Sequence, residues 1–511
     1  MSFSRSLLTT SAIGLCLMAT TATAELSAAQ VWGDWRSYLE GLGYSVTATE
    51  TASGTSLSVS DISVVVNQGP LDGTALIRTG PLEFVQTGSG SVEVVMPPSM
   101  PVILDITPAA GGEPIQMTLD YTQTGQSMIA SGDATAMVYA YTADTFGLAM
   151  SSLVVDGMAM DQNAAQFFAG GDALRSQTTV TVGDTRSYAQ NITLGNMVYD
   201  MFFKDPEAIE AMRLNTTITS LGFEGTSTLP LTPATGPQEL VPLLAAGFAL
   251  DGTFTATGSE NRIEVTSDEG TTRIKTGSAK TTLGVAMAPD GIRYDVASEQ
   301  VEVGGTLAGL PFPLFAQMAN TGFTLQTPVM KSEDPQDFAL AVNLTQFTMS
   351  DIIWALFDPA GQLPRDPATI AVDLAAKVRM MADAFDTDLM QKLATGSTQP
   401  PEVSALDVKR LTVDAVGARI DATGAFTFDN TDKVTLPGFP KPVGDLTINI
   451  AGANGLLDKL VALGFLPAEQ VMGARMMLGL FAVPGATPDT LSSRIEFNEA
   501  GQILANGQRI K

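Results

Sequence analysis

Carboxylates are the most abundant groups in this chain that could do chemistry, with 54 Asp and Glu against 27 Lys and Arg. Two carboxyl groups at a fixed separation and with unequal pKa values can hydrolyse a glycosidic bond. No spacing in the sequence marks such a pair, and aromatic residues, which form platforms in sugar-binding clefts, make up only 7%. We therefore rank a secreted polysaccharide-active hydrolase as the alternative, behind a non-catalytic role.

The residues that the chain lacks exclude several kinds of active site. It contains no histidine, and its one cysteine is Cys16. A mature chain that starts after Cys16 could form no disulfide, no thiolate nucleophile, no zinc or copper site built on His or Cys, and no Ser-His-Asp triad. No serine lies three residues before a lysine, and no phosphate-binding glycine motif occurs. We expect no cofactor.

Calcium is the metal that suits a chain with only oxygen ligands. The best clusters are residues 429–432 and residues 268–270, and neither follows the calcium-loop pattern. Because Asp and Asn are also common in hairpin turns, we predict turns here and no metal site.

Arg365 stands out because cations are scarce around it. An arginine in such a loop could clamp an anion. We favour an internal ion pair with Asp366 or Asp358, which would fix a structural loop that also contains Trp354.

The formal net charge of −27 argues against binding to nucleic acid or to anionic lipid through a basic patch, since both need clustered Lys and Arg. Hydrophobic residues make up 45% and charged residues 16%, which is typical of a folded protein. Between Glu25 and Asp200 the cations are Arg36, Arg78, Arg175 and Arg186.

Residues 1–24 have the pattern of a secretory signal peptide. Arg5 supplies the positive start, residues 7–18 form a short apolar run, and small residues precede Glu25. A lipid anchor on Cys16 is disfavoured because Leu15 occupies the position where a small residue is needed. We predict cleavage after Ala24 and a periplasmic or secreted protein.

Short alternating runs rich in Val, Ile, Leu and Thr dominate the mature chain, and turn residues separate them, which predicts an antiparallel meander. We expect a mainly β (α+β) fold of large sheets with a few amphipathic helices packed on one face or at the ends. The Pro/Thr stretch at residues 229–237 divides an N-terminal domain, residues 25–230, from a C-terminal domain, residues 231–511. Helices are predicted at residues 30–43, 208–214, 238–248, 311–319, 350–357, 454–465 and 468–481.

Several segments resemble a known family. They are the opening helix around Trp32, residues 353–359 running into residues 363–369, the helical pair ending at Leu478, and residues 495–507. Together they resemble an alphaproteobacterial family of secreted proteins of unknown function, domain of unknown function 2125. The last segment also resembles the ends of YdgA-like and AsmA-like envelope proteins. The resemblance implies a periplasmic protein with long curled antiparallel sheets, and it supplies no catalytic residues.

The chain has 23 methionines, many of them in apolar stretches. Methionine fills irregular cores and also lines adaptable apolar surfaces. We predict a non-catalytic envelope protein whose partner is lipid or another envelope protein, with an apolar ligand held in a β-sheet groove. The terminal helical pair would gate that groove or form a fixed lid. Its candidate ligand face consists of Leu460, Val461, Met472, Met476 and Leu480.

Overall fold

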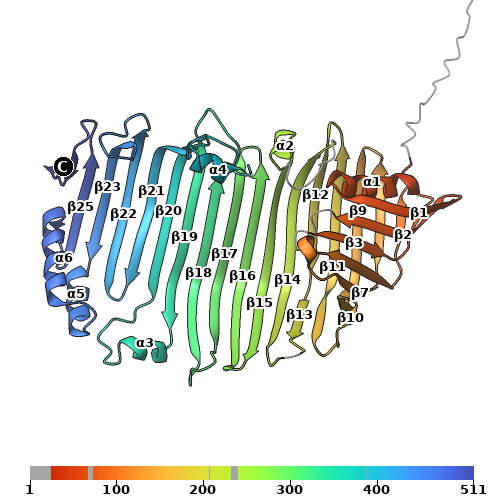
Figure 1. The fold of residues 1–511 in the computed structure, drawn as a ribbon, viewed down its shortest axis with the longest axis horizontal. Helices are drawn as coiled ribbons and strands as arrows, with labels where there is room; N and C mark the ends of the chain where they lie inside the picture. The colour runs from red at the N-terminus through yellow and green to blue at the C-terminus, as the bar shows by residue number, and fades with distance from the viewer. Residues whose placement is uncertain (1–24, 67–72, 207, 232–239, 387) are drawn as a thin grey trace, which may run out of the picture.

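The computed structural model describes residues 25–66, 73–206, 208–231, 240–386 and 388–511. Within these ranges the chain forms a single antiparallel sheet of 27 strands, with helices over one face, at one end and in connections at the upper and lower edges (Figure 1). The prediction of a mainly β fold is confirmed, with one continuous sheet in place of several. The predicted signal peptide, residues 1–24, lies outside the described residues.

The first part of the described chain contains one α-helix and many short strands. A 3-10 turn, η2 (Ala109–Gly111), connects β6 and β7. The elements are α1 (Ala28–Gly41), β1 (Ser45–Ser53), β2 (Ser56–Val66), β3 (Thr74–Thr79), β4 (Leu82–Gln86), β5 (Val92–Val95), β6 (Ser99–Thr107), β7 (Ile115–Thr124), β8 (Ser127–Asp133), β9 (Ala136–Val155), β10 (Met158–Ala159), β11 (Ala165–Val182), β12 (Thr185–Leu194), β13 (Met197–Lys204) and β14 (Ala211–Pro230).

The second part consists mostly of long strands. The elements are α2 (Leu240–Ala245), β15 (Ala249–Ser267), β16 (Gly270–Ala288), β17 (Gly291–Thr306), β18 (Leu314–Thr327), β19 (Gln336–Met349), α3 (Asp351–Phe357), β20 (Ala368–Arg379), α4 (Leu389–Ala394), β21 (Glu402–Ala415), β22 (Ala418–Asp429), β23 (Lys441–Ala451), α5 (Ala453–Ala462), α6 (Ala468–Phe481), β24 (Val483–Pro484), β25 (Thr490–Phe497), β26 (Ile503–Ala505) and β27 (Gln508–Arg509).

From β14 onward the sheet is a simple meander, in which each strand pairs with the next one as far as β23, and β23 then pairs with β25. Before β14, the place of one long strand is in several cases taken by two short strands that lie end to end. For example, β12 and β13 both lie between β11 and β14, one along each half. The ladder also crosses the predicted domain boundary, because β14 pairs with β15 over most of its length. The division into two domains stays a prediction.

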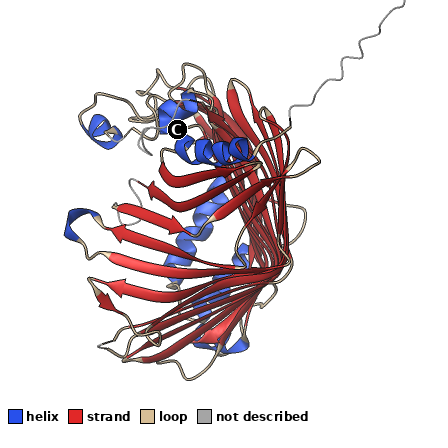
Figure 2. Ribbon diagram, turned by 90° about the vertical axis from the view of Figure 1, so that its right-hand side faces the viewer, coloured by secondary structure: helices blue, strands red, loops and turns tan. Residues whose placement is uncertain are grey.

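The long strands are themselves strongly bent, so the sheet forms a trough when it is viewed end-on (Figure 2). Residues in the left-handed region lie in the middle of several long strands: Ala173, Gly258, Gln300 and Gln346. The ladder skips these positions. In β15, for example, Ser259 pairs with Ile218 and Thr257 pairs with Ser220, so Gly258 is left out. Such irregularities bend a strand and increase its twist, so they account for the curvature.

Helix α1 lies on the concave side at the N-terminal end of the sheet (Figures 1 and 2). It begins with a capping box, in which Ser27 and Gln30 satisfy each other's backbone N–H groups. Val31 and Trp32 are buried in the main core together with Phe84. The remaining core residues come from β2, β4, β5, β8, β9 and β11, so α1 is fixed by the first strands of the sheet.

Two predicted helices are wrong. Residues 208–214 lead into β14, and residues 311–319 lead into β18. In the first case the apolar residues Met212 and Leu214 pair with Phe203 and Met201 of β13, so cross-strand packing outweighs the local helical spacing. By contrast, residues 468–481 form α6 with the predicted bounds.

Candidate apolar ligand site

A row of apolar side chains crosses the concave face of the sheet from β14 to β23. Each member is the direct cross-strand partner of the next, and all ten are apolar. Since neighbouring strands lie about 4.8 Å apart, the row is about 40 Å long. In order, it consists of Phe223, Phe254, Leu283, Val296, Phe323, Val342, Val372, Leu411, Ala422 and Ile448.

A second row runs beside the first and extends to β25. It lies two residues from the first row in each strand except β21, where a bulge makes the separation three. It contains only glycine and apolar or aromatic residues. We call the two rows together the apolar stripe. The second row consists of Gly225, Gly252, Val285, Tyr294, Leu325, Leu340, Leu374, Val408, Gly424, Leu446 and Ile495.

Several members of the first row are open to solvent. Phe254 is 43% exposed, Phe323 37% and Val342 39%. Large apolar side chains of a soluble protein normally pack against another layer, so a row with several exposed members indicates a binding surface. Its backbone N–H and C=O groups are used by the ladder on both sides, so the stripe offers a ligand apolar contact and few hydrogen bonds.

The opposite face of the same strands is polar. Because side chains alternate along a strand, the row next to Phe223 faces away from the stripe. It carries three carboxylates and an arginine among small residues: Glu224, Thr253, Gly284, Asp295, Thr324, Ala341, Asp373 and Arg410.

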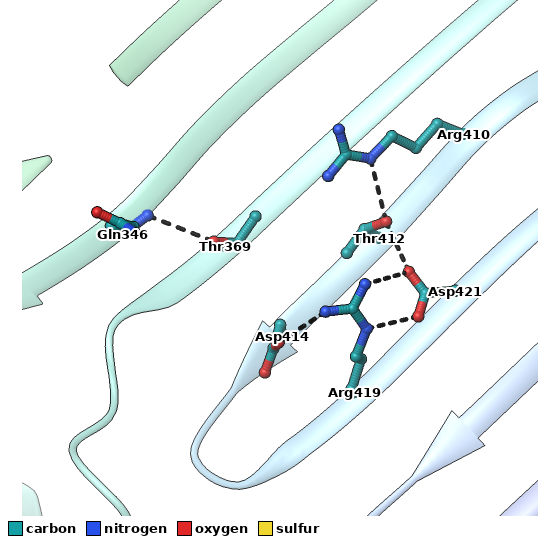
Figure 3. Close-up of polar contacts among 7 residues, drawn as sticks. All are labelled: Gln346, Thr369, Arg410, Thr412, Asp414, Arg419 and Asp421. Atoms are coloured by element: carbon teal, nitrogen blue, oxygen red, sulfur yellow. Dashed lines mark hydrogen bonds and ion pairs between the residues drawn. The ribbon is translucent and has the colours of Figure 1, made fainter. Parts of the chain in front are cut away.

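Polar side chains on this outer face satisfy one another, as Figure 3 shows for the β21–β22 hairpin. Arg419 donates two hydrogen bonds to Asp421, at 2.6 and 3.0 Å, and one to Asp414, at 3.1 Å. Thr412 donates to Asp421 at 2.8 Å and accepts from Arg410 at 3.3 Å. The hydrogen bonds from Arg419 hold the pKa of Asp421 below its ordinary value. This face is therefore a solvated outer surface.

At its N-terminal end the apolar stripe passes beneath α1 into a pocket of about 710 Å³. Trp35, Tyr38 and Leu39 of α1 form one wall, and Phe223 and Phe254 belong to the floor. The two phenyl rings lie 4.5 Å apart between centroids. The glycines of the second row leave room for the Phe223 ring. A Cβ atom at Gly225 or Gly252 would lie only 2.7 or 2.8 Å from that ring.

A buried polar cluster ties α1 to the sheet at the edge of this pocket. Arg186 Nη2 lies 2.6 Å from Asp34 Oδ1, and the Tyr139 hydroxyl donates to Asp34 Oδ2 at 2.7 Å. Burial and the neighbouring Asp34 carboxylate raise the pKa of Tyr139, so its hydroxyl stays protonated and keeps donating. The cluster fixes the position of α1 over the stripe.

The helical pair that was predicted to carry the ligand face lies at the other end of the sheet, beside β25 (Figure 1). α5 packs against α6 and against β22. Leu460 and Val461 of α5 are half-buried, whereas Met472 and Met476 of α6 are each 70% exposed and Leu480 is 58% exposed. The structure thus places the five residues at the C-terminal end, far from the pocket beneath α1, and their role as a gate stays a prediction.

In the predicted structural loop, Arg365 forms its ion pair with a residue other than Asp366 or Asp358. Arg365 pairs with Asp351 at 2.5 Å and lies over the Trp354 ring, 5.7 Å from its centroid. Asp358 is fully buried and accepts from two backbone N–H groups, those of Gln362 and Leu363, at 2.9 and 2.8 Å.

Asp358 shows how this loop is held together. Burial alone would raise the pKa of Asp358, but the two backbone hydrogen bonds and the charge of Arg365 outweigh burial and hold the pKa below its ordinary value. Asp366 lies exposed beside this arrangement. Trp354, Asp358 and Arg365 are thus brought together in a loop that closes the β19–β20 connection.

Many carboxylates elsewhere are paired with cations, which bears on the hydrolase alternative. A hollow of about 820 Å³ is lined by four carboxylates, Asp200, Glu260, Glu264 and Glu302, and three of them have cationic partners. Asp200 pairs with Arg213, Glu260 with Arg262 and Lys275, and Glu264 with Arg273. The hydrogen bond from Lys275 lowers the pKa of Glu260, whereas a general acid needs a raised pKa.

The candidate calcium cluster at residues 429–432 forms a turn. Asp429 accepts hydrogen bonds from Thr431, and Asp432 from Val434 and Thr435, so their oxygens serve the turn itself. In the described ranges there is no group of three or more Asp or Glu residues arranged to hold a metal ion.

The sequence reasoning did not find the pocket or its polar cluster. Asp34 and Arg186 are 152 residues apart, and only the folded sheet brings them together. One signal was available: Arg186 is one of four cations between residues 25 and 200, and a cation that becomes buried needs a partner.

Fold and site define a class: an open, curved antiparallel sheet with one apolar face, covered at one end by an amphipathic helix. A family described as uncharacterized protein conserved in bacteria, DUF2125, matches residues 209–505, and the chain belongs to this family. Comparison with curated proteins and with solved structures found no match. No α-helix in the described part of the chain is long and apolar enough to cross a membrane.

Proposed function

We propose that this protein is a non-catalytic periplasmic envelope protein that holds the acyl chains of lipids along the apolar stripe. The observation that carries the proposal is the unbroken register of apolar residues over ten consecutive strands. A stripe that is apolar throughout, and whose backbone is already hydrogen-bonded in the ladder, suits a chain of methylene groups better than a peptide or a sugar, both of which need polar partners.

The length of the stripe supports the same ligand. The hydrocarbon core of a bilayer, which is two acyl chains deep, is about 30 Å thick. A stripe of about 40 Å therefore has room for two acyl chains end to end. The signal-peptide pattern of residues 1–24 supports a location beside the envelope membranes.

The experiment compares two substitutions at neighbouring positions of β18. Phe323→Glu puts a carboxylate on the apolar stripe, and Thr324→Glu puts the same group on the outer polar face. We expect the wild-type protein and Thr324→Glu, purified from the periplasm, to carry lipid that mass spectrometry detects, and Phe323→Glu to carry much less. Lipid content that is equal in the two variants, or absent from the wild type, would overturn the proposal.

A further inference from the structure

The pocket beneath α1 differs from the rest of the stripe because polar groups line part of it. Tyr188 of β12 and Tyr139 of β9 both contribute to its wall. Its volume of about 710 Å³ is within the ordinary range for small-molecule sites. The pocket adjoins the first members of the stripe, Phe223 and Phe254, so a chain lying on the stripe can end inside it.

The hydroxyl of Tyr188 is the unusual group in this pocket. Its oxygen is buried beside the Arg186 side chain, and no acceptor for its hydrogen is found in the described part of the chain. Arg186 lies close enough to lower the pKa of Tyr188, but a guanidinium carries only donors, so it cannot accept the phenolic hydrogen. A buried donor without an acceptor destabilises the folded protein, so the site is incomplete as it stands.

The tyrosine is held in place by its neighbours. The Tyr38 ring of α1 lies edge-on to the Tyr188 ring, with 5.1 Å between centroids. Burial raises the pKa of Tyr188, so its hydroxyl is neutral and able to donate at neutral pH. The ring is thus fixed by the same helix that covers the pocket.

The charges around the pocket narrow the class of acceptor. Asp34 and Arg186 neutralise each other in their ion pair, and Tyr139 already donates to Asp34. No net positive charge is left to stabilise a carboxylate, since an anion that is buried without a counter-charge is costly. A neutral acceptor oxygen, such as the carbonyl of an acyl ester, fits this setting.

Building on the proposed function, we infer that the pocket beneath α1 binds the ester end of an acyl lipid, with the Tyr188 hydroxyl donating a hydrogen bond to the ester carbonyl. The apolar stripe then receives the hydrocarbon chain. The site therefore distinguishes acyl esters from free fatty acids and from plain hydrocarbons.

The test measures the binding of monoolein, oleate and 1-octadecene by displacement of a fluorescent acyl probe from the full mature chain. We compare the wild type with Tyr188→Phe, which removes only the hydroxyl, and with Tyr199→Phe, a control on β13 outside the pocket. We expect Tyr188→Phe to bind monoolein about tenfold more weakly and octadecene equally well, since one hydrogen bond is worth about that factor. The wild type should prefer monoolein to oleate.

The outcomes separate this inference from the proposal beneath it. Suppose that the wild type binds the probes. If Tyr188→Phe then binds monoolein as well as the wild type does, or binds monoolein and octadecene equally weakly, Tyr188 is not the donor, and only this inference is overturned. If the wild type binds none of the three probes, the proposed function falls as well. Thermal unfolding checks the fold: Tyr188→Phe should unfold at the wild-type temperature or above it, because the lost hydroxyl had no acceptor.

Discussion

Arg186 and Asp34 form a buried ion pair, 2.6 Å between Nη2 and Oδ1, that joins β12 to α1. The side chain of Asp34 is 3% exposed and that of Arg186 is 12% exposed. Tyr139 adds a hydrogen bond to the same carboxylate. The position of α1 over the apolar stripe therefore depends on one buried ion pair.

Loss of one partner should destabilise the protein strongly. We predict that Asp34→Ala lowers the free energy of unfolding by about 3–5 kcal/mol, because it leaves the Arg186 guanidinium buried without a counter-charge. The matched control is Asp105→Ala, which breaks a more exposed pair with Arg78 and should cost less than about 1 kcal/mol. Urea denaturation measures both, and equal losses would show that the Asp34 pair is no more important than a surface pair.

The C-terminal helical pair yields a second prediction. Met476 is largely exposed on α6, whereas Val471 on the same helix is buried. Met476→Asp should therefore change the free energy of unfolding by less than about 1 kcal/mol, and Val471→Asp should lower it by about 2–5 kcal/mol.

The same variant tests whether α6 is a gate or a fixed lid. A gate that contacts the ligand predicts that Met476→Asp folds normally but retains less lipid than the wild type. Unfolding of Met476→Asp, together with unchanged lipid content in any folded fraction, would count against the gate.

Acid should weaken the β19–β20 loop through Asp358. The pKa of Asp358 in the folded protein lies below its value of about 3.9 in the unfolded chain. Between these two pKa values the unfolded chain therefore binds more protons than the folded protein does. The contribution of Asp358 is therefore complete above about pH 4 and is lost as the pH falls further. We predict that Asp358→Asn is less stable than the wild type at neutral pH and that the difference shrinks below about pH 4.

Denaturation at several pH values checks this, with Asp366→Asn as an exposed control that should follow the wild type throughout. A difference between Asp358→Asn and the wild type that stays constant from neutral pH to pH 3 would mean that the Asp358 charge does not matter to the fold.

Export is predicted from the N-terminal pattern alone. Deletion of residues 1–24 should leave the protein in the cytoplasm, and N-terminal sequencing of the exported form should begin at Glu25. An exported form that begins at a lipid-modified Cys16 would show a lipoprotein instead.

Local patterns predicted some helices closely and missed others. Apolar spacing located α1, although the prediction began at Gln30 and the helix begins at Ala28, because Ser27 provides the cap. Ser350 occupies the N-cap position of α3, where serine is common, but its side chain makes no capping hydrogen bond.

Strand lengths were underestimated because the alternation changes phase within a strand. In β15 the apolar residues fall at an even position, Phe254, and later at odd positions, Ile263 and Val265. The change follows Gly258, whose positive φ interrupts the ladder, so one strand has the sequence pattern of two.

The apolar stripe itself could not be predicted from any single segment. Each strand contributes only one residue to a row, and the row exists because the nine registers between ten strands agree. A shift of one residue in β18, for example, would replace Phe323 with Thr324 on the concave face. The sequence analysis predicted an apolar ligand in a β-sheet groove. It placed the ligand face on α5 and α6 because the pairing register of the strands cannot be derived from the separate segments.

The most direct measurement places a photo-reactive phenylalanine analogue at Phe323 or at Thr324 and irradiates cells that export the protein. The two positions are neighbours in β18 but face opposite sides of the sheet. If acyl chains lie on the apolar stripe, position 323 should cross-link to lipid, detected by mass spectrometry, and position 324 should not. Equal lipid labelling at both positions, or none at 323, would contradict the account.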